Sequence, residues 1–132
     1  TPEASMMASK ISAVPSVRAY LLDLQRNMAK AHNVIMDGRD IGTVVLPDAK
    51  VKIFLTASPE ARSQRRYKEL CEKGMDVKYE DILKDVITRD YNDSHRETAP
   101  LKPAEDCVMV DTTELDFEQS VEKIISVIKE NI

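Results

Sequence analysis

One stretch near residue 35 most constrains how this chain can fold. Three apolar residues at positions 34–36 run directly into Asp37, Gly38, Arg39 and Asp40. A short and wholly apolar run of this kind is typical of a strand buried on both faces of a parallel sheet. Ligands of open α/β sheets bind at the carboxyl ends of the strands. The sequence therefore predicts a buried strand at 34–36, with charged side chains at a ligand-binding edge.

Two further apolar runs have the length of buried strands. They cover residues 51–55 and 107–110, and Asp111 follows the second run as Asp37 follows the first. Helical patterns separate the three runs. Short strands that alternate with helices predict an α/β fold, with a parallel sheet flanked by helices. A length of 132 residues suits one domain.

The expected helices have recognisable starts and ends. Thr1-Pro2, Pro15 and Ser58-Pro59 can each open a helix, and Gly74 can end the third. Further helices are expected at 79–93 and after the capping-box pair Asp116 and Gln119, with a short helix or turn at 41–46. Helical spacing predicts two core-facing stripes. Their members are Val17, Leu21, Leu24 and Met28 in one helix, and Val121, Ile124, Ile125 and Ile128 in the last.

The charge distribution favours a small anionic ligand over a nucleic acid. The net charge is −4, so no global positive field favours nucleic-acid binding. The arginines nevertheless gather locally, and clustered arginines on an acidic protein indicate a compact anion. The clusters are Arg62, Arg65 and Arg66 in one expected helix, and Arg89 and Arg96 in the next.

The cysteine pattern and the lack of long apolar spans bear on the compartment. Cys71 and Cys107 form no CxxC pair, so we expect two free thiols in a reducing cytosol. No signal-peptide pattern and no apolar span of membrane length is present in the sequence. We therefore expect a cytoplasmic protein without a membrane partner.

The residues that follow the first expected strand have the chemistry of a nucleotide site. Asp37 could hold Mg²⁺ directly or through water, and Gly38 allows a close backbone approach. Arg39 could clamp a phosphate with two parallel hydrogen bonds. Asp40 could accept from a base amino group or a sugar hydroxyl. The alternative is a strand-to-turn junction with a surface ion pair.

A second group is Arg89, Asp93 and Arg96, which steps of four and three residues place on one helical stripe. The arginines could hold a phosphate, while Asp93 fixes them or binds a ribose hydroxyl. The alternative is an exposed ion pair that contributes only ~0.3–0.5 kcal/mol. Ser9 and Arg18 flank the helix break at Pro15 and could read the edge of a base, although spacing alone indicates structural or surface roles.

Arg62, Arg65 and Arg66 lie on one face of an expected helix. Crowded cations repel one another unless anions meet them, and a triphosphate would do so. The alternative is a solvated basic face.

Several of these motifs together resemble one protein family. Residues 37–45, Asp-Gly-Arg-Asp-Ile-Gly-Thr-Val-Val, resemble the signature stretch of bacterial cytidylate (CMP) kinases. The likeness covers essentially the whole chain. Its other parts are residues 47–49 and 51–58, Ala61-Arg62, Arg65-Arg66, Arg89-Asp90, Asp93 to Arg96, Ala99-Pro100-Leu101, Ser9 and Pro15-Ser16-Val17-Arg18.

The resemblance implies an activity and a role for each matching residue. Cytidylate kinases transfer the γ-phosphoryl group of ATP to CMP or dCMP and use Mg²⁺. The implied cytosine readers are Ser9, Arg18 and Asp40, and the implied phosphate clamps are Arg39 and Arg96. Arg89 and Asp93 resemble partners of the ribose and phosphate, and Asp37 resembles the acid that supports Mg²⁺. Arg62, Arg65 and Arg66 resemble the start of an arginine-rich lid over ATP, at about residues 62–96.

The chain departs from the family at one important feature. Cytidylate kinases begin with a strand and a glycine-rich phosphate loop, G-x-x-x-x-G-K-S/T, which this sequence lacks. We expect the C-terminal three-fifths or so of a P-loop nucleoside monophosphate kinase, without the first strand and inactive alone. The empty slot between the strands near 34 and 51 could be filled by swapped or paired strands, although the parent is expected to be a monomer. A non-catalytic CMP-binding module and a kinase for another pyrimidine monophosphate remain as alternatives.

Overall fold

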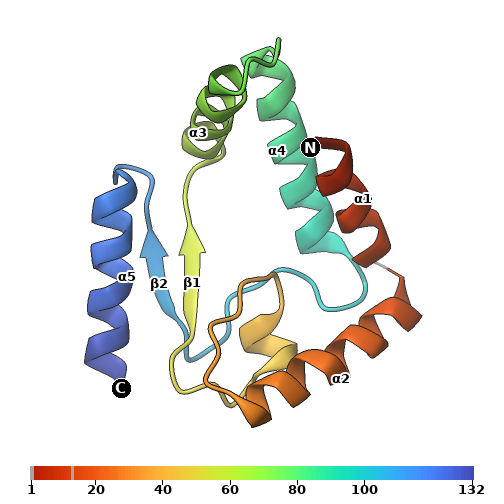
Figure 1. Ribbon diagram of the computed structural model, residues 1–132, viewed down its shortest axis with the longest axis vertical. Helices are drawn as coiled ribbons and strands as arrows, with labels where there is room; N and C mark the ends of the chain where they lie inside the picture. The colour runs from red at the N-terminus through yellow and green to blue at the C-terminus, as the bar shows by residue number, and fades with distance from the viewer. Residues whose placement is uncertain (1, 13) are drawn as a thin grey trace.

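The computed structural model describes residues 2–12 and 14–132, and the side chains of residues 2, 3, 5 and 9 fall outside the description. Figure 1 shows a small sheet with helices around it. The elements in chain order are α1 (Pro2–Ser12), α2 (Pro15–Ala31), the π-helix η1 (Ile41–Val45), β1 (Ile53–Thr56), α3 (Pro59–Glu72), α4 (Tyr79–His95), β2 (Val108–Asp111) and α5 (Phe117–Asn131).

The sheet in the described part of the chain consists of β1 and β2. The two strands are parallel, with Ile53 opposite Val108 and Thr56 opposite Asp111. The connection between them runs through α3 and α4, and α5 follows β2 and lies beside it (Figure 1). Val110 is only 1% exposed and lies at the centre of the core. The predicted α/β fold, with a parallel sheet flanked by helices, is confirmed.

The start and end signals of the helices work as the sequence predicts. The Ser58 side chain accepts a hydrogen bond from the backbone N–H of Ala61 at 3.1 Å, so it caps α3. Gly74 follows α3 with φ of +72°, a left-handed conformation that costs glycine little. Asp116 and Gln119 form both bonds of the predicted capping box at the start of α5.

The predicted strand at residues 34–36 is absent, so this prediction was wrong. The segment carries no strand assignment, and Ile35 is 95% exposed. A strand exists only where a neighbouring strand pairs with its N–H and C=O groups. No strand in the described part of the chain lies beside this segment, because the sheet consists of β1 and β2 alone. The apolar run is therefore extended but unpaired.

The two predicted core stripes are only partly buried. None of the described side chains of α2 is buried, and Leu24 of α2 is 48% exposed. This helix contacts α1 and η1, which leaves much of its apolar stripe without a packing partner. In α5, Ile125 is 44% exposed while Val127, outside the predicted stripe, is buried. Position on a helical stripe predicts burial only where a second layer covers the stripe.

The helices α3 and α4 form a packed pair that extends beyond the sheet (Figure 1). Leu70 of α3 and Ile82 of α4 are buried, and Tyr67 meets Tyr79 edge to face with ring centroids 6.2 Å apart. The packing places the C-terminal end of α4 near η1 and α2. Among the described helices, none is both long and apolar enough to span a bilayer.

Candidate functional site

The first group of site residues centres on the carboxylate of Asp40. Arg18 of α2 donates to Asp40 Oδ2 and also, through Nη1, to the carbonyl of Ser12 at 3.0 Å. Arg96 Nη2 lies 4.0 Å from Asp40 Oδ1, so two guanidinium groups share this carboxylate. All three charged side chains are largely buried, with 12–18% of each exposed. Burial weakens solvent screening, so these pairs hold one another more firmly than surface pairs do.

Arg96 is fixed by its position at the end of α4. The helix ends at His95, so Arg96 is the C-cap residue, and the predicted stripe of three charged residues does not continue to it. Its Nε donates to the carbonyl of Ala99 at 2.7 Å. Ala99 has φ of +50°, a left-handed conformation that costs a residue with a Cβ roughly 1 kcal/mol or more. The loop thus holds a strained backbone that turns a carbonyl onto Arg96.

The second group of site residues centres on Asp93, which is only 7% exposed. Arg39 Nε donates to Asp93 Oδ2 at 3.0 Å, and Arg89 Nε lies 3.9 Å from the same oxygen. The sequence left open an exposed ion pair between Arg89 and Asp93. In the structure Arg89 is 44% exposed, but Asp93 is buried and also bonds to Arg39, which lies 54 residues earlier in the chain, so the pair is not wholly exposed.

One cavity of about 480 Å³ brings both groups together. Six of the seven residues expected at a CMP site line this cavity. They are Arg18, Arg39, Asp40, Arg89, Asp93 and Arg96. The seventh, Ser9, belongs to α1, and its side chain lies outside the described residues. The structure therefore brings six of the seven expected residues together around one cavity.

The cavity carries a net positive charge. Four arginines against three carboxylates, those of Asp37, Asp40 and Asp93, leave a formal charge of +1, counted over the charged residues that line it. The Nη2 of Arg96 is buried and has no hydrogen-bond partner among the described residues. A buried donor that stays unsatisfied costs roughly 1–3 kcal/mol, and more when it is charged. This donor is therefore suited to an acceptor from a bound anion.

Apolar side chains form another part of the same cavity. They include Leu22 of α2 and Val44 and Val45 of η1. A cavity with a cationic end and an apolar wall fits a ligand that joins an anionic group to a flat, weakly polar ring.

Asp37 is exposed and lines both this cavity and a second one. Its carboxylate has no hydrogen-bond or ion-pair partner among the described residues, which leaves its oxygens available. No group of three or more potential metal ligands occurs within the described part of the chain. A single carboxylate fits Mg²⁺ where waters and substrate phosphates supply most of the ligands, and it does not fit a metal held by protein alone.

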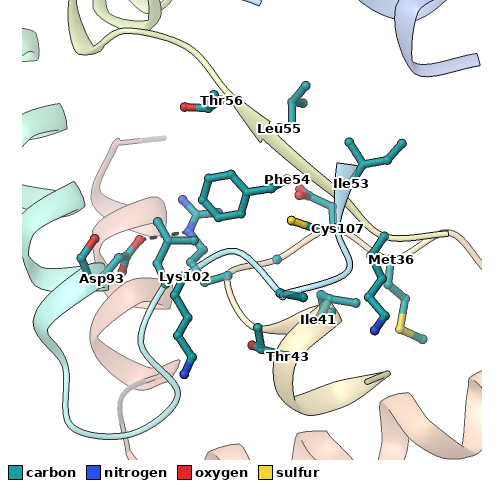
Figure 2. Close-up of a pocket in the computed structure, with 18 of the residues that line it drawn as sticks. Met36, Ile41, Thr43, Ile53, Phe54, Leu55, Thr56, Asp93, Lys102 and Cys107 are labelled. Atoms are coloured by element: carbon teal, nitrogen blue, oxygen red, sulfur yellow. Dashed lines mark hydrogen bonds and ion pairs between the residues drawn. The ribbon is translucent and has the colours of Figure 1, made fainter. Parts of the chain in front are cut away.

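The second cavity has a volume of about 460 Å³ and lies between residues 36–43 and β1. Figure 2 shows Phe54 of β1, Cys107 and Met36 around it, with Asp93 at one side. The edge of β1 that faces away from β2 has no strand partner in the described chain. Cys107 and Cys71 are free thiols, as the sequence predicts.

The arginines of α3 have partners within the chain, whereas the sequence suggested a basic face open to a triphosphate or to solvent. Arg62 donates to Asp90 of α4 at 2.9 Å, and this hydrogen bond raises the pKa of the Arg62 guanidinium. Arg66 donates to Glu69 at 2.8 Å. Glu69 also accepts from Lys73, and the two bonds lower its pKa to about 2. These cations therefore already have carboxylate partners within the chain.

Arg65 has a different role from its two neighbours. It donates to the carbonyl oxygens of Thr112 and Leu115, the latter at 3.1 Å. These carbonyls follow β2, so Arg65 ties α3 to the carboxyl end of the sheet. The three arginines do not converge on one point, although their spacing suggested a shared face.

Sequence reasoning missed two residues that shape the site. Asp90 was not recognised as the partner of Arg62, although it directly follows Arg89 in the chain. Arg26 of α2 was also missed, and it bonds the carbonyls of Val44 and Val45. Neither contact leaves a local sequence signal, because the partners lie 18 or more residues apart.

Comparison with known proteins identifies the family. The family model described as cytidylate kinase matches residues 1–130. A cytidylate kinase of Thermosipho melanesiensis is 53% identical over 130 residues, which are 98% of this chain and 60% of that protein. One of Carboxydothermus hydrogenoformans is 52% identical over 128 residues, which are 97% of this chain and 58% of that protein. The chain thus spans about three-fifths of the length of these relatives. The chain belongs to the cytidylate kinase family.

Proposed function

We propose that this chain forms the CMP-binding part of a cytidylate kinase that transfers the γ-phosphoryl group of ATP to CMP or dCMP. The observation that carries the proposal is the cavity in which four arginines meet three carboxylates, with Arg96 Nη2 buried and without a hydrogen-bond partner among the described residues. A phosphate monoester carries about −1.5 to −2 charges at pH 7, so the net positive charge of the cavity favours its binding. The apolar wall from α2 and η1 then suits the base.

The phosphate of CMP would be held by Arg39 and Arg96, with Arg89 beside it. Their guanidinium groups offer paired donors that match phosphate oxygens. Asp93 keeps Arg39 and Arg89 in place and is a candidate partner of a ribose hydroxyl.

The base would be read at the Asp40 end of the cavity by Ser9, Arg18 and Asp40. Cytosine has an exocyclic amino group, which can donate to a carboxylate. Uracil has a carbonyl oxygen at the same position and cannot donate there. Asp40 therefore supports a preference for cytosine over uracil.

The reaction itself would be an in-line transfer without a covalent enzyme intermediate, based on positioning and charge neutralisation. Mg²⁺ bound with ATP neutralises the phosphate oxygens, and Asp37 would hold it through water. Arg39 and Arg96 would orient the acceptor phosphate. Arg62, Arg65 and Arg66 would belong to a lid at about residues 62–96, in which Arg62 and Arg66 exchange their carboxylate partners for ATP phosphates.

The ATP side of such a site is incomplete in this chain. The sequence has three glycines and no G-x-x-x-x-G-K-S/T phosphate loop. In a P-loop nucleoside monophosphate kinase fold, a further strand would occupy the cavity beside β1. We therefore propose that the chain alone binds CMP and transfers no phosphoryl group. The complete enzyme would be a cytoplasmic monomer.

Calorimetry and a coupled ADP-release assay on the purified 132-residue chain test this proposal. We expect CMP to bind more tightly than UMP, without CMP-dependent ADP release. Absence of CMP binding would contradict the assigned site. Clear CMP-dependent turnover would show that the chain is complete enough for catalysis.

A non-catalytic CMP-binding module is the second candidate, favoured by the contrast between a well-formed CMP side and an absent phosphate loop. A longer protein that includes the missing loop separates the two candidates. Turnover by that protein supports the kinase, whereas CMP binding without turnover supports the module.

A further inference from the structure

The helix α2 holds the π-helix η1 at both of its ends. At the start, Arg18 donates to the carboxylate of Asp40, the N-cap residue of η1. At the end, Arg26 donates through Nη2 to the carbonyl of Val44 at 2.7 Å and through Nε to that of Val45 at 3.1 Å. Arg18 and Arg26 lie eight residues apart, about 12 Å along the helix axis. Two arginines of one helix thus fix both ends of a five-residue segment.

The segment needs such support because it is short and irregular. π-helices are rare, and single turns of them occur mostly at functional sites. The backbone carbonyl of Asp40 accepts from the N–H groups of Val44 at 2.8 Å and Val45 at 3.1 Å. The carbonyls at the end of a helix have no partner within it, and a cation there is favourable. Arg26 supplies two donors in one planar group for two of these carbonyls.

These contacts connect Arg26 to the carboxylate that faces the cavity. The N–H groups of Val44 and Val45 both bond the Asp40 carbonyl, so the backbone that carries the Asp40 side chain is joined to the residues that Arg26 holds. We propose that Arg26 is a positioning residue, which sets the Asp40 carboxylate for base recognition without touching the ligand. The base-recognition part rests on the proposed function, whereas the effect on η1 does not.

A purely stabilising role for Arg26 makes a different prediction. In that case its removal lowers the melting temperature, while the remaining folded molecules keep both the geometry of η1 and the preference for CMP over UMP. The two roles therefore differ in their effects on the folded state.

The first measurement is residue-resolved amide hydrogen exchange by NMR, without nucleotide. We compare the wild type with Arg26→Met, which keeps an apolar stem but removes the donors, and with Lys30→Met as a matched control. Lys30 is an exposed cation one turn further along α2. We expect exchange at Val44, Val45 and Leu46 to rise on the order of tenfold in Arg26→Met alone. Unchanged exchange at these amides would overturn the positioning role.

The sheet amides serve as the internal reference for folding. The N–H of Val108 donates to the carbonyl of Lys52, and the N–H of Thr112 donates to the carbonyl of Thr56. Exchange at both should match the wild type. If the sheet amides lose their protection in Arg26→Met as well, the variant Arg26→Lys is tested in its place. Lysine keeps the charge but not the planar pair of donors, so η1 protection should still fall, and wild-type protection in Arg26→Lys would overturn the proposal.

The second measurement is the ratio of CMP to UMP affinity. We expect Arg26→Met to lower this ratio on the order of tenfold, since a small displacement of a recognition group can cost that much or more. Lys30→Met should leave it unchanged. A wild-type ratio in Arg26→Met would overturn the link to Asp40. Failure of the wild type to bind CMP would instead overturn the proposed function, and the exchange data alone would then decide the role of Arg26.

Discussion

The two cavities of this molecule have similar volumes, about 480 and 460 Å³, and share a wall at residues 37–39, but they differ in what they collect. The first gathers four arginines around two buried or nearly buried carboxylates. The second is bounded by the unpaired edge of β1 and by Met36, and charged side chains line it as well, among them Arg62 and Asp90, which pair with each other. Size therefore does not distinguish a ligand site here. The distinction lies in a buried donor without a hydrogen-bond partner, Arg96 Nη2, since Arg96 lines only the first of the two cavities.

The largest expected effect is the loss of CMP binding in Arg96→Met. The change removes a buried guanidinium whose Nη2 has no hydrogen-bond partner among the described residues. A hydrogen bond to a charged group contributes ~1.5–3 kcal/mol, so we expect affinity to fall by roughly tenfold to a hundredfold by calorimetry. Phe54→Leu, in the wall of the second cavity, is the matched control and should bind CMP as the wild type does. Equal losses in both variants would remove the distinction between the cavities.

A smaller effect is expected from Asp93→Asn, because the substitution leaves Arg39 and Arg89 without a shared carboxylate. Both arginines are more than a third exposed, so solvent screens part of the loss, and we expect about 1–2 kcal/mol of destabilisation in urea. Added phosphate should recover part of this stability, since an anion can take the place of the carboxylate. The exposed Asp48→Asn serves as the control. No recovery with phosphate would argue against an anion site between these arginines.

The smallest effect concerns Glu69 on α3, whose pKa is lowered from 4.5 to about 2 by Lys73 and Arg66. A lowered pKa in the folded state means that the contribution to stability is present above pH 4.5 and is lost as the pH falls toward 2. Because the Glu69 side chain is 45% exposed, salt should screen its interaction with these partners. We expect the Glu69 pKa, followed by NMR, to rise toward 4.5 in high salt. If salt leaves the pKa unchanged, the ion pair between Arg66 and Glu69 is firmly held, and Arg66 is then less available to an incoming anion.

The sequence predicted local signals well and long-range pairing poorly. The caps at Ser58 and Asp116 and the turn at Gly74 depend on residues within four positions, and the structure contains all three. The strand at 34–36 failed because strand formation depends on a neighbour, which the described chain does not supply. The stripe on α2 failed for the same reason, since burial requires a covering layer.

The candidate site shows the same division. The motif around Arg39 and Asp40 predicted a nucleotide site, and six of the seven residues expected at the CMP site line one cavity. The burial of Asp93 and the fork of Arg26 on Val44 and Val45 could not be predicted, because contacts between distant segments decide them.

The wall at residues 37–39 has one more consequence. Since Asp37, Gly38, Arg39, Ile41 and Asp93 line both cavities, an occupant of the β1 cavity and a ligand of the arginine cavity share part of their surroundings. Their binding free energies are then coupled, and linkage makes this coupling reciprocal. If an occupant of one cavity changes the affinity for a ligand of the other by some factor, that ligand changes the affinity for the occupant by the same factor.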